Sequence, residues 1–297
     1  MLGDLYDRAL GGEHCWIRYD DGEVRVLPTR RWLGGRASDE SFDEAVAGLC
    51  SGPTLELGCG PGRLVARLVR RGIPALGIDR SAAAVRLAGR AGAPVLLGDV
   101  FESLPGVGHW QTVLLIDGNI GLGGDPLRIL GRAAELLNRG GRCVAEFDAE
   151  AIGVRSRWVR LELASEVGPW FRWASVGADS APILAAQAGL RLTSVRMIGG
   201  QVLASLTARG ATTDFPPDFG ARWKRYRPPH PDARWEPDAE RWAPNLRLDA
   251  GLGSRPQAGT CLVGVNSRRR RSPELSESYD SRPKPESTDE SGWSSVS

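Results

Sequence analysis

The stretch from Thr54 to Leu64 (TLELGCGPGRL) constrains the fold of this 297-residue chain more than any other feature. Its first four residues form a mostly apolar run that begins with a β-branched residue, which predicts a short buried strand. Alternating glycines follow, and apolar residues then recur at helical spacing between Arg63 and Arg71. Because glycine lacks a Cβ atom and a helix N-terminus offers unpaired N–H groups, this strand, glycine turn and helix together predict a nucleotide-binding site.

The spacing of the glycines distinguishes between two kinds of ligand. A dinucleotide fingerprint needs glycine at the first, third and sixth positions of the turn, but the sixth position counted from Gly58 is Arg63. Gly-x-Gly-x-Gly preceded by an acid, Glu56, instead resembles the first motif of class I S-adenosylmethionine (SAM)-dependent methyltransferases. A carboxylate there suits the cationic amino-acid end of SAM, whereas it would repel a pyrophosphate. The alternative is a purely structural turn, because glycine motifs alone are weak evidence.

Two further predicted strands end in an acid. Residues 74–79 end in Asp79, about 20 residues after the glycine turn, where a ribose-binding carboxylate is expected, and Ser81 can cap the next helix. Residues 93–101 form a third strand that carries Asp99. In the resembled family this position accepts from the amino group of adenine, and the next residue, Val100, donates its backbone N–H to the ring. Either acid could instead only lead into a helix or start a turn.

A fourth strand is predicted at residues 111–117, apolar enough to be buried on both faces. It ends at Asp117, and a glycine-rich loop with Asn119 follows. In the resembled fold the methyl group and its acceptor meet here, so Asp117 and Asn119 are the candidate catalytic residues, and Asp117 could act as a general base. Both could instead only form the turn. The resemblance implies a SAM site formed by Glu56, Gly58, Cys59, Gly60, Gly62, Asp79, Arg80, Asp99, Val100 and Asp117.

Alternating strands and helices predict an α/β fold. The expected architecture is a Rossmann-like, doubly wound, seven-stranded and mostly parallel sheet with an antiparallel last strand. A helix closed by Gly140-Gly141, a strand at 143–148, a helix capped by Asp179 or Ser180, and strands at 190–197 and 201–208 complete it. Residues 51–209 would form the methyltransferase domain, with a hairpin inserted at 154–177. Its Trp170, Phe171 and Trp173 could line a pocket or simply pack.

Extensions are expected at both ends of this domain. Residues 1–50 predict a hairpin (15–19 and 23–27) and a helix capped by Asp39 or Ser41. This extension could be a lid whose Trp16, Tyr19 and Trp32 stack on a substrate, or these aromatic residues could pack the hairpin on the core. Residues 210–297 are rich in proline, arginine and serine and poor in apolar residues, which predicts a mostly disordered tail.

Composition narrows the classes of function. A net charge of +2 does not favour nucleic acid as a partner, and the loop after Asp117 lacks the Asn-Pro-Pro-aromatic signature of base methylation. The five scattered cysteines show neither metal-ligand spacing nor a disulfide framework, so no metal site is expected. No secretion signal and no membrane-spanning run of ~20 apolar residues is visible, which favours the cytoplasm. The sequence defines no oligomeric state.

We therefore predict a cytoplasmic transferase that moves a methyl group from SAM to a small-molecule acceptor by in-line displacement. Because a sulfonium is already a good leaving group, alignment and exclusion of water are the main tasks of such a protein. Two alternatives stay open. One is a SAM-binding regulator without catalysis, tethered by the basic run 268–271. The other is an NAD(P)-dependent oxidoreductase on the same sheet, against which Arg63 counts.

Overall fold

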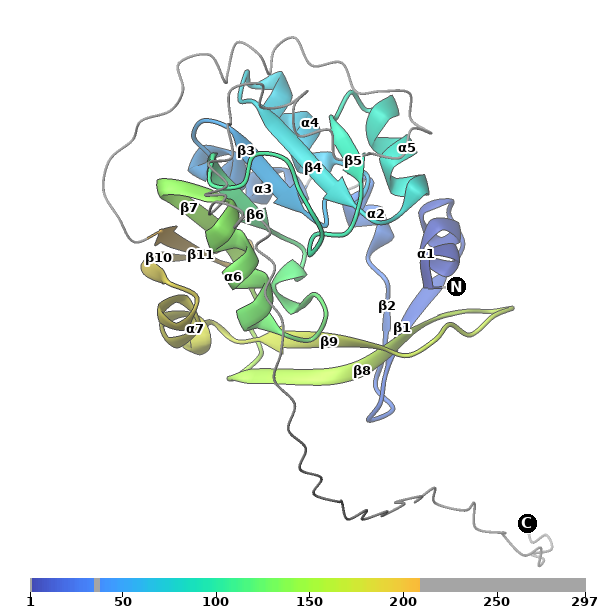
Figure 1. The fold of residues 1–297 in the computed structure, drawn as a ribbon. Helices are drawn as coiled ribbons and strands as arrows, with labels where there is room; N and C mark the ends of the chain where they lie inside the picture. Colours follow the sequence, from blue (N-terminus) through green and yellow to red (C-terminus); the bar gives the residue numbers. More distant parts are fainter. Residues whose placement is uncertain (1, 35–37, 209–297) are drawn as a thin grey trace, which may run out of the picture. The chain divides into compact units, whose positions relative to one another are not determined.

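The structure is a computed structural model, which describes residues 2–34 and 38–208 (Figure 1). Its main element is a seven-stranded sheet in the order β10-β11-β7-β6-β3-β4-β5. The strands are β3 (Thr54–Leu57), β4 (Ala75–Asp79), β5 (Val95–Leu97), β6 (Trp110–Leu115), β7 (Leu137–Phe147), β10 (Leu190–Ile198) and β11 (Gln201–Ala208). The pairs from β5 to β7 are parallel, and β11 runs antiparallel to both of its neighbours. The predicted fold class is confirmed.

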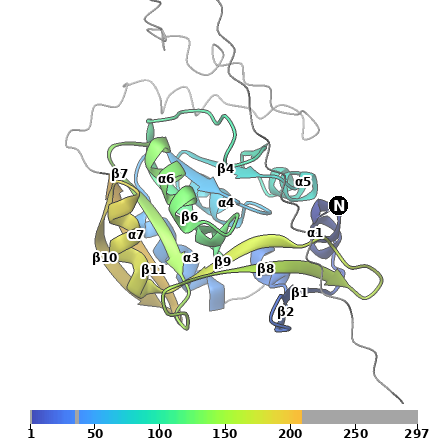
Figure 2. The ribbon, with the colours of Figure 1, turned by 60° about the horizontal axis from the view of Figure 1, so that its bottom comes forward.

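Helices cover both faces of this sheet (Figures 1 and 2). One face packs on α3 (Ser38–Leu49), α4 (Arg63–Arg70) and α5 (Ala82–Arg90), and the other packs on α6 (Pro126–Leu136) and α7 (Ala181–Gln187). Side chains alternate along each strand, so in β3 Leu55 and Leu57 join the α6 face, whereas Glu56 points to the opposite face. The carboxyl ends of the parallel strands share one edge, where ligands bind in open α/β sheets.

Several predicted boundaries differ from the observed ones for local reasons. The helix α6 ends at Leu136, and Gly140 lies inside β7, where the register with β6 is irregular. Neither Asp179 nor Ser180 caps α7 through its side chain, because a 3₁₀ turn (Ala178–Ser180) precedes the helix and Asp179 accepts from the backbone N–H of Gly153 instead. The helix α3 already begins at Ser38. The Ser81 cap is confirmed, since its hydroxyl accepts from Ala84 N–H.

A second sheet joins the two predicted hairpins. It contains β1 (Cys15–Tyr19), β2 (Val24–Val26), β8 (Val154–Leu163) and β9 (Phe171–Val176), all antiparallel in the order β2-β1-β8-β9. The sequence did not predict this pairing, because the strands that meet, β1 and β8, are distant in the chain and neither carries a signal for the other. The inserted hairpin is thereby tied to the N-terminal segment.

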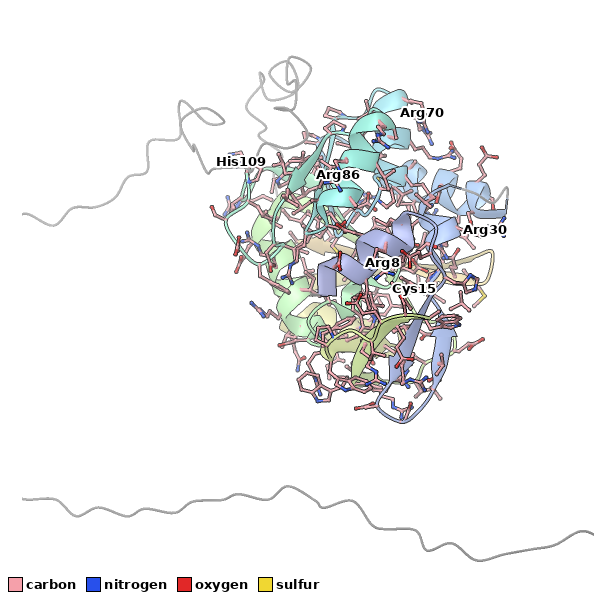
Figure 3. The ribbon with its side chains drawn as sticks, turned by 90° about the vertical axis from the view of Figure 1, so that its right-hand side faces the viewer. Arg8, Cys15, Arg30, Arg70, Arg86 and His109 are labelled. Carbon is pink, nitrogen blue, oxygen red and sulfur yellow. The ribbon has the colours of Figure 1, made fainter. Side chains whose placement is uncertain are left out.

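The N-terminal segment also contains two short helices, α1 (Leu2–Leu10) and α2 (Thr29–Trp32). Figure 3, which looks onto α1, shows this helix between α5 and the four-stranded sheet. Leu5 and Ala9 of α1 pack with Leu161 and Leu163 of β8. The sequence analysis missed α1, although the spacing of Leu5, Ala9 and their apolar neighbours is helical. The predicted tail, 210–297, lies outside the described residues.

Candidate active site

The glycine turn joins β3 to α4 at the carboxyl edge of the sheet. Gly58, Gly60 and Gly62 have φ of 74°, 52° and 76°, which favours glycine at all three positions. Steric space also requires glycine at position 58, because a Cβ atom there would lie 2.8 Å from Nδ2 of Asn119. The thiol of Cys59 is buried against Gly77, and burial raises its pKa well above the ordinary value. Cys59 is thus a packing residue beneath the turn.

Asp79 lies next to the glycine turn, as predicted. Its carboxylate ends β4 and accepts from the backbone N–H of Gly60 at 2.7 Å and of Ser81 at 2.8 Å. Burial raises the pKa of Asp79, and these backbone donors partly oppose that increase. The strand β4 and the glycine turn are therefore joined through a carboxylate that has backbone partners on both sides.

Asp99 and Arg80 lie together at the edge of the sheet. They line a pocket of about 410 Å³ whose walls include Ile78, Leu96 and Leu104. Asp99 follows β5 by two residues and accepts from the backbone N–H of Phe101 at 2.9 Å, while Nε of Arg80 lies 3.7 Å from its other carboxylate oxygen. Val100, the next residue, is buried in the core, and its carbonyl accepts from Nε of Arg132.

Glu56 is buried at the centre of the site. Burial raises the pKa of Glu56 well above the ordinary value, and the negative charges of Asp117 and Asp79 raise it further. The backbone N–H of Val65, in the first turn of α4, opposes this effect. Oε2 of Glu56 is buried and has no hydrogen-bond partner within the described part of the chain. A buried acceptor without a donor costs free energy, so this oxygen fits a site that a hydrogen-bonding ligand completes.

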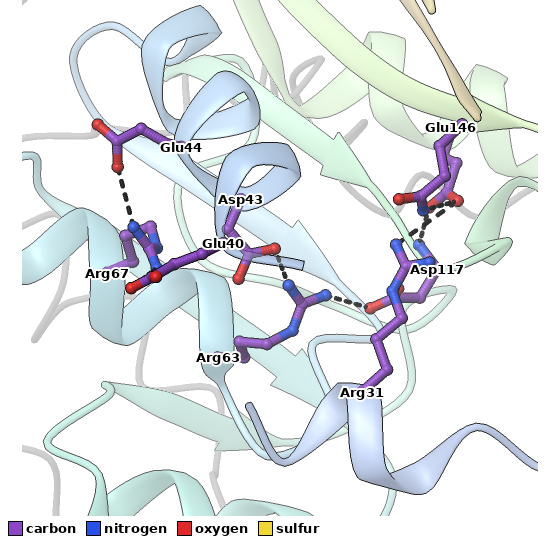
Figure 4. Close-up of polar contacts among 9 residues, drawn as sticks. Arg31, Glu40, Asp43, Glu44, Arg63, Arg67, Asp117 and Glu146 are labelled. Atoms are coloured by element: carbon purple, nitrogen blue, oxygen red, sulfur yellow. Dashed lines mark hydrogen bonds and ion pairs between the residues drawn. The ribbon is translucent and has the colours of Figure 1, made fainter. Parts of the chain in front are cut away.

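Asp117 follows β6 and is held by two arginines from distant segments (Figure 4). Oδ1 lies 2.9 Å from Nε of Arg31 in α2, and Oδ2 lies 2.9 Å from Nη2 of Arg63, the first residue of α4. Arg63 also pairs with Asp43 of α3. Asp117 has a φ of 57°, and among the described residues it is the only one besides glycines with a positive φ. Unusual backbone conformations tend to occur at functional sites, so the positive φ and the ion pairs make this turn a candidate part of the site.

Glu146, near the end of β7, extends this cluster. Its Oε2 accepts from the backbone N–H of Asp117 at 2.6 Å, and its Oε1 accepts from Nε2 of Gln201 at 2.7 Å and lies 3.7 Å from Nη2 of Arg31. Burial raises the pKa of Glu146, and the charge of Asp117 acts in the same direction. The sequence analysis missed Glu146, Arg31 and Asp43. The signal for Glu146 was a further acid near the end of a parallel strand.

The side chain of Asn119 forms hydrogen bonds within the protein. Its Nδ2 donates to the backbone carbonyl oxygens of Leu57 at 2.9 Å and of Gly58 at 2.7 Å, and the side chain is buried. The amide thus ties the loop after β6 to the glycine turn, which favours the turn-forming alternative for this residue.

The N-terminal segment contacts the same edge. A Cβ atom at Gly60 would lie 3.3 Å from the hydroxyl of Tyr6 in α1, and burial, followed by the charge of Asp79, raises the pKa of Tyr6 well above the ordinary value. Ser81 donates its hydroxyl hydrogen to Asp7. Trp32 lies against Tyr6, with ring centroids 5.8 Å apart. Residues of this segment therefore contact the glycine turn and the loops after β4 and β6.

The other aromatic residues considered from the sequence lie in different places. Trp16 lies against His14, and Tyr19 lies under the guanidinium of Arg157. In the inserted hairpin, Trp170 lies under Arg160, and Phe171 packs beside the cluster that contains Leu5 of α1. Trp173 approaches the loop after β6, since a Cβ atom at Gly121 would lie 3.0 Å from its Nε1. Trp173 thus reaches the loop after β6, and Trp32 packs on Tyr6, which lies against the glycine turn.

No family model and no curated protein matches this chain. Among solved structures, a SAM-dependent methyltransferase from Bacteroides fragilis in complex with S-adenosyl-L-homocysteine is similar, with a TM-score of 0.57 and 17% identity over 70% of this chain and 94% of that one. A Burkholderia thailandensis 1,6-didemethyltoxoflavin-N1-methyltransferase has a TM-score of 0.46 and 16% identity over 61% of this chain and 82% of that one. The fold is that of class I SAM-dependent methyltransferases.

Membrane-spanning helices and metal sites are both absent from the described residues. No helix among them is long and apolar enough to cross a bilayer. They also contain no group of three or more His, Cys, Asp or Glu side chains that could hold a metal ion.

Proposed function

We propose that this protein is an enzyme that transfers a methyl group from SAM to a small-molecule acceptor. The observation that carries the proposal is the position of Glu56 in β3, Asp79 at the end of β4 and Asp99 two residues after β5, at the carboxyl ends of three adjacent strands. Asp79 is joined to the glycine turn, and a buried Glu56 oxygen is satisfied by no described donor. SAM carries the methyl group on a sulfonium sulfur, and this sulfur is a good leaving group when the methyl group is transferred. The protein's tasks are to bind, to align and to exclude water.

The residues at this edge fit the three parts of SAM. Asp99 and Arg80 line a pocket with an apolar wall, suited to adenine with its exocyclic amino group. Asp79 would accept from the ribose hydroxyls while the glycine turn holds its carboxylate. At the amino-acid end, Glu56 and Asp117 suit the ammonium group, and the guanidinium groups of Arg31 and Arg63 suit the carboxylate.

We further propose that the N-terminal segment acts as the lid over this site. The support is that Tyr6 of α1 lies against Gly60 and Arg31 of α2 pairs with Asp117, while Trp32 packs on the Tyr6 ring. A closed segment would exclude water from the transfer. We place the enzyme in the cytoplasm, in keeping with four buried, free cysteines in the described part of the chain.

Isothermal calorimetry with SAM tests the proposal. We expect micromolar-range binding to the wild-type protein and much weaker binding to the Glu56→Ala, Asp79→Ala and Asp99→Ala variants. Glu135→Ala is the matched control, because Glu135 is an exposed carboxylate that pairs with Arg132 on α6, away from the glycine turn. Formation of S-adenosylhomocysteine from SAM in the presence of a metabolite extract tests catalysis. A folded wild-type protein that binds NAD but not SAM would refute the proposal.

A further inference from the structure

The turn after β6 holds Asp117 in the left-handed region of backbone conformation. Asp117 and Gly118 have φ of 57° and 79°. The N–H of Asn119 closes the turn by donating to the carbonyl oxygen of Ile116 at 3.2 Å. Glycine adopts a positive φ readily, whereas for aspartate, which tolerates it better than most residues, the conformation still costs free energy. Contacts from outside the turn therefore help to keep Asp117 in this conformation.

Glu146 supplies such a contact from the neighbouring strand β7 (Figure 4). Its neighbours Ala145 and Phe147 belong to the core on the α6 face, so alternation along the strand turns Glu146 to the opposite face. Glu56 of β3 points to the same face. There, Oε2 of Glu146 accepts from the backbone N–H of Asp117 at 2.6 Å, an N–H that the closing bond of the turn does not use. Glu146 thus fixes the peptide that leads into Asp117.

The Glu146 carboxylate is itself fixed on its other side. Oε1 accepts from Nε2 of Gln201 at 2.7 Å and lies 3.7 Å from Nη2 of Arg31. Gln201 begins β11, which lies on the other side of β7 from β6, so the carboxylate spans from one neighbouring strand to the other. Only 13% of the side chain is exposed. Because both oxygens are engaged within the protein, Glu146 acts on its neighbours rather than on a ligand.

The position of the Asp117 carboxylate depends on this backbone. A change in φ rotates the Cα–Cβ bond of Asp117 relative to β6 and would swing the carboxylate away from Arg31 and Arg63, each 2.9 Å away. Nε of Arg63 and Oε2 of Glu56 are buried and have no hydrogen-bond partner among the described residues. Buried polar atoms of this kind fit a site that a ligand completes. The backbone of Asp117 therefore sets where these groups meet a ligand.

We infer that Glu146 is a positioning residue for the amino-acid end of SAM, an inference that rests on the proposed function. It holds the backbone of Asp117 so that the Asp117 carboxylate keeps Arg31 and Arg63 in place for the ligand. Gln201 has a supporting role, since its amide fixes the orientation of the Glu146 carboxylate. The role requires an acceptor oxygen at position 146 and not a negative charge, so glutamine should replace Glu146 and leucine should not.

Calorimetry with SAM on the full chain tests this requirement. We expect Glu146→Leu to weaken SAM binding by about tenfold, since the N–H of Asp117 loses its acceptor, and Glu146→Gln to stay within about threefold of wild type. Glu135→Leu on α6 is the matched control, because that glutamate is exposed and pairs with Arg132. Equal losses in Glu146→Gln and Glu146→Leu would show that the charge matters rather than the acceptor, and would overturn the inference.

A double-mutant cycle separates positioning from a merely structural role. Asp117→Gly removes the carboxylate, and glycine adopts a φ of 57° freely, so Glu146 has no carboxylate left to position. Adding Glu146→Leu to this variant should then leave SAM affinity unchanged, whereas general damage to the fold would weaken binding equally in both backgrounds. Gln201→Leu should give a smaller loss that also vanishes with Asp117→Gly, and it replaces Glu146→Leu in the cycle if that variant does not fold.

Melting temperatures show whether each variant is folded at the temperature of the titration. Wild-type affinity in Glu146→Leu, or equal weakening with and without the Asp117 carboxylate, would overturn the inference alone. A wild-type protein that binds no SAM would instead refute the proposed function, and the inference with it.

Discussion

Asp79 ends β4 and Asp117 follows β6, the two strands that flank β3, but different kinds of group hold the two carboxylates. Asp79 accepts from two backbone N–H groups, of Gly60 and Ser81, within one strand–turn–helix region. Asp117 pairs with two guanidinium groups, one of which comes from α2 in the N-terminal segment. One side of the crevice is therefore formed by local backbone geometry, and the other depends on a distant segment docking onto it.

This difference has a consequence for ligand binding. A carboxylate held by backbone donors keeps its position when side chains move, so the end of the site proposed to bind ribose would be preorganised. If the N-terminal segment opens as proposed, Arg31 would leave Asp117, so the amino-acid end would change with that segment. We expect affinity for SAM to reside mainly on the Asp79 side, and closure of the site to depend on the Asp117 side.

The largest expected effect is therefore the loss of SAM binding in Asp79→Ala. Two charge-assisted hydrogen bonds to the ribose, at roughly 1.5–3 kcal/mol each, correspond to at least ~100-fold in the dissociation constant. Calorimetry of Asp79→Ala and Asp117→Ala measures the comparison directly. If Asp117→Ala weakened SAM binding more than Asp79→Ala, the proposed division between the two sides would be reversed.

Glu56 lies on β3 between the two aspartates, and the charges of both aspartates raise its pKa. The second prediction therefore concerns Glu56. Its pKa is raised in the folded protein, which means that above the unfolded value of 4.5 the folded state holds a proton that the unfolded state releases. Stability should therefore fall as pH rises through this window, by up to about 1.4 kcal/mol per pH unit from this group.

The Glu56→Gln variant removes this contribution. Urea unfolding of both proteins from about pH 5 to pH 8 should show Glu56→Gln increasingly more stable than wild type as pH rises, while its affinity for SAM falls. A difference in unfolding free energy that stays constant with pH would show that Glu56 is ionised in the folded protein. The site would then lack the buried acidic group that links its two sides.

The third prediction concerns Arg31, the contact of α2 with Asp117 and Glu146. Arg31→Gln should weaken SAM binding by about tenfold, since one charge-assisted pair is lost, and should speed hydrogen exchange in α1 and α2. Arg30→Gln is the matched control, because Arg30 is an exposed neighbour on the same short helix. Unchanged exchange in Arg31→Gln would show that this arginine does not hold the segment closed.

The same contrast explains how much could be predicted from the sequence. The alternation of elements, the glycine turn, Asp79 and the Ser81 cap depend on residues close together in the chain, and the structure brings them together as expected. The strands β1 and β8 pair although they lie more than a hundred residues apart in the chain, and no local pattern indicates this pairing. Arg31 lies in a segment without a recognisable pattern, and its partner Glu146 is also more than a hundred residues away. The position of Asn119 after a predicted strand made it a candidate site residue, but only the structure shows that its side chain bonds to the backbone of the glycine turn.

The smallest expected effect tests the contact by which Tyr6 of the N-terminal segment approaches the backbone-held side. The hydroxyl of Tyr6 lies against Gly60, whose N–H is already bound to Asp79, and the ring lies against Trp32. Tyr6→Phe keeps the ring and removes only the hydroxyl, so a several-fold loss of SAM affinity is expected, about 1 kcal/mol for one hydrogen bond. Tyr6→Ala also removes the packing and should approach Arg31→Gln in its effect on hydrogen exchange. If Tyr6→Phe weakened binding as strongly as Asp79→Ala, the hydroxyl itself would be a main cofactor ligand, and the side formed by local backbone would depend on the N-terminal segment as much as Asp117 does.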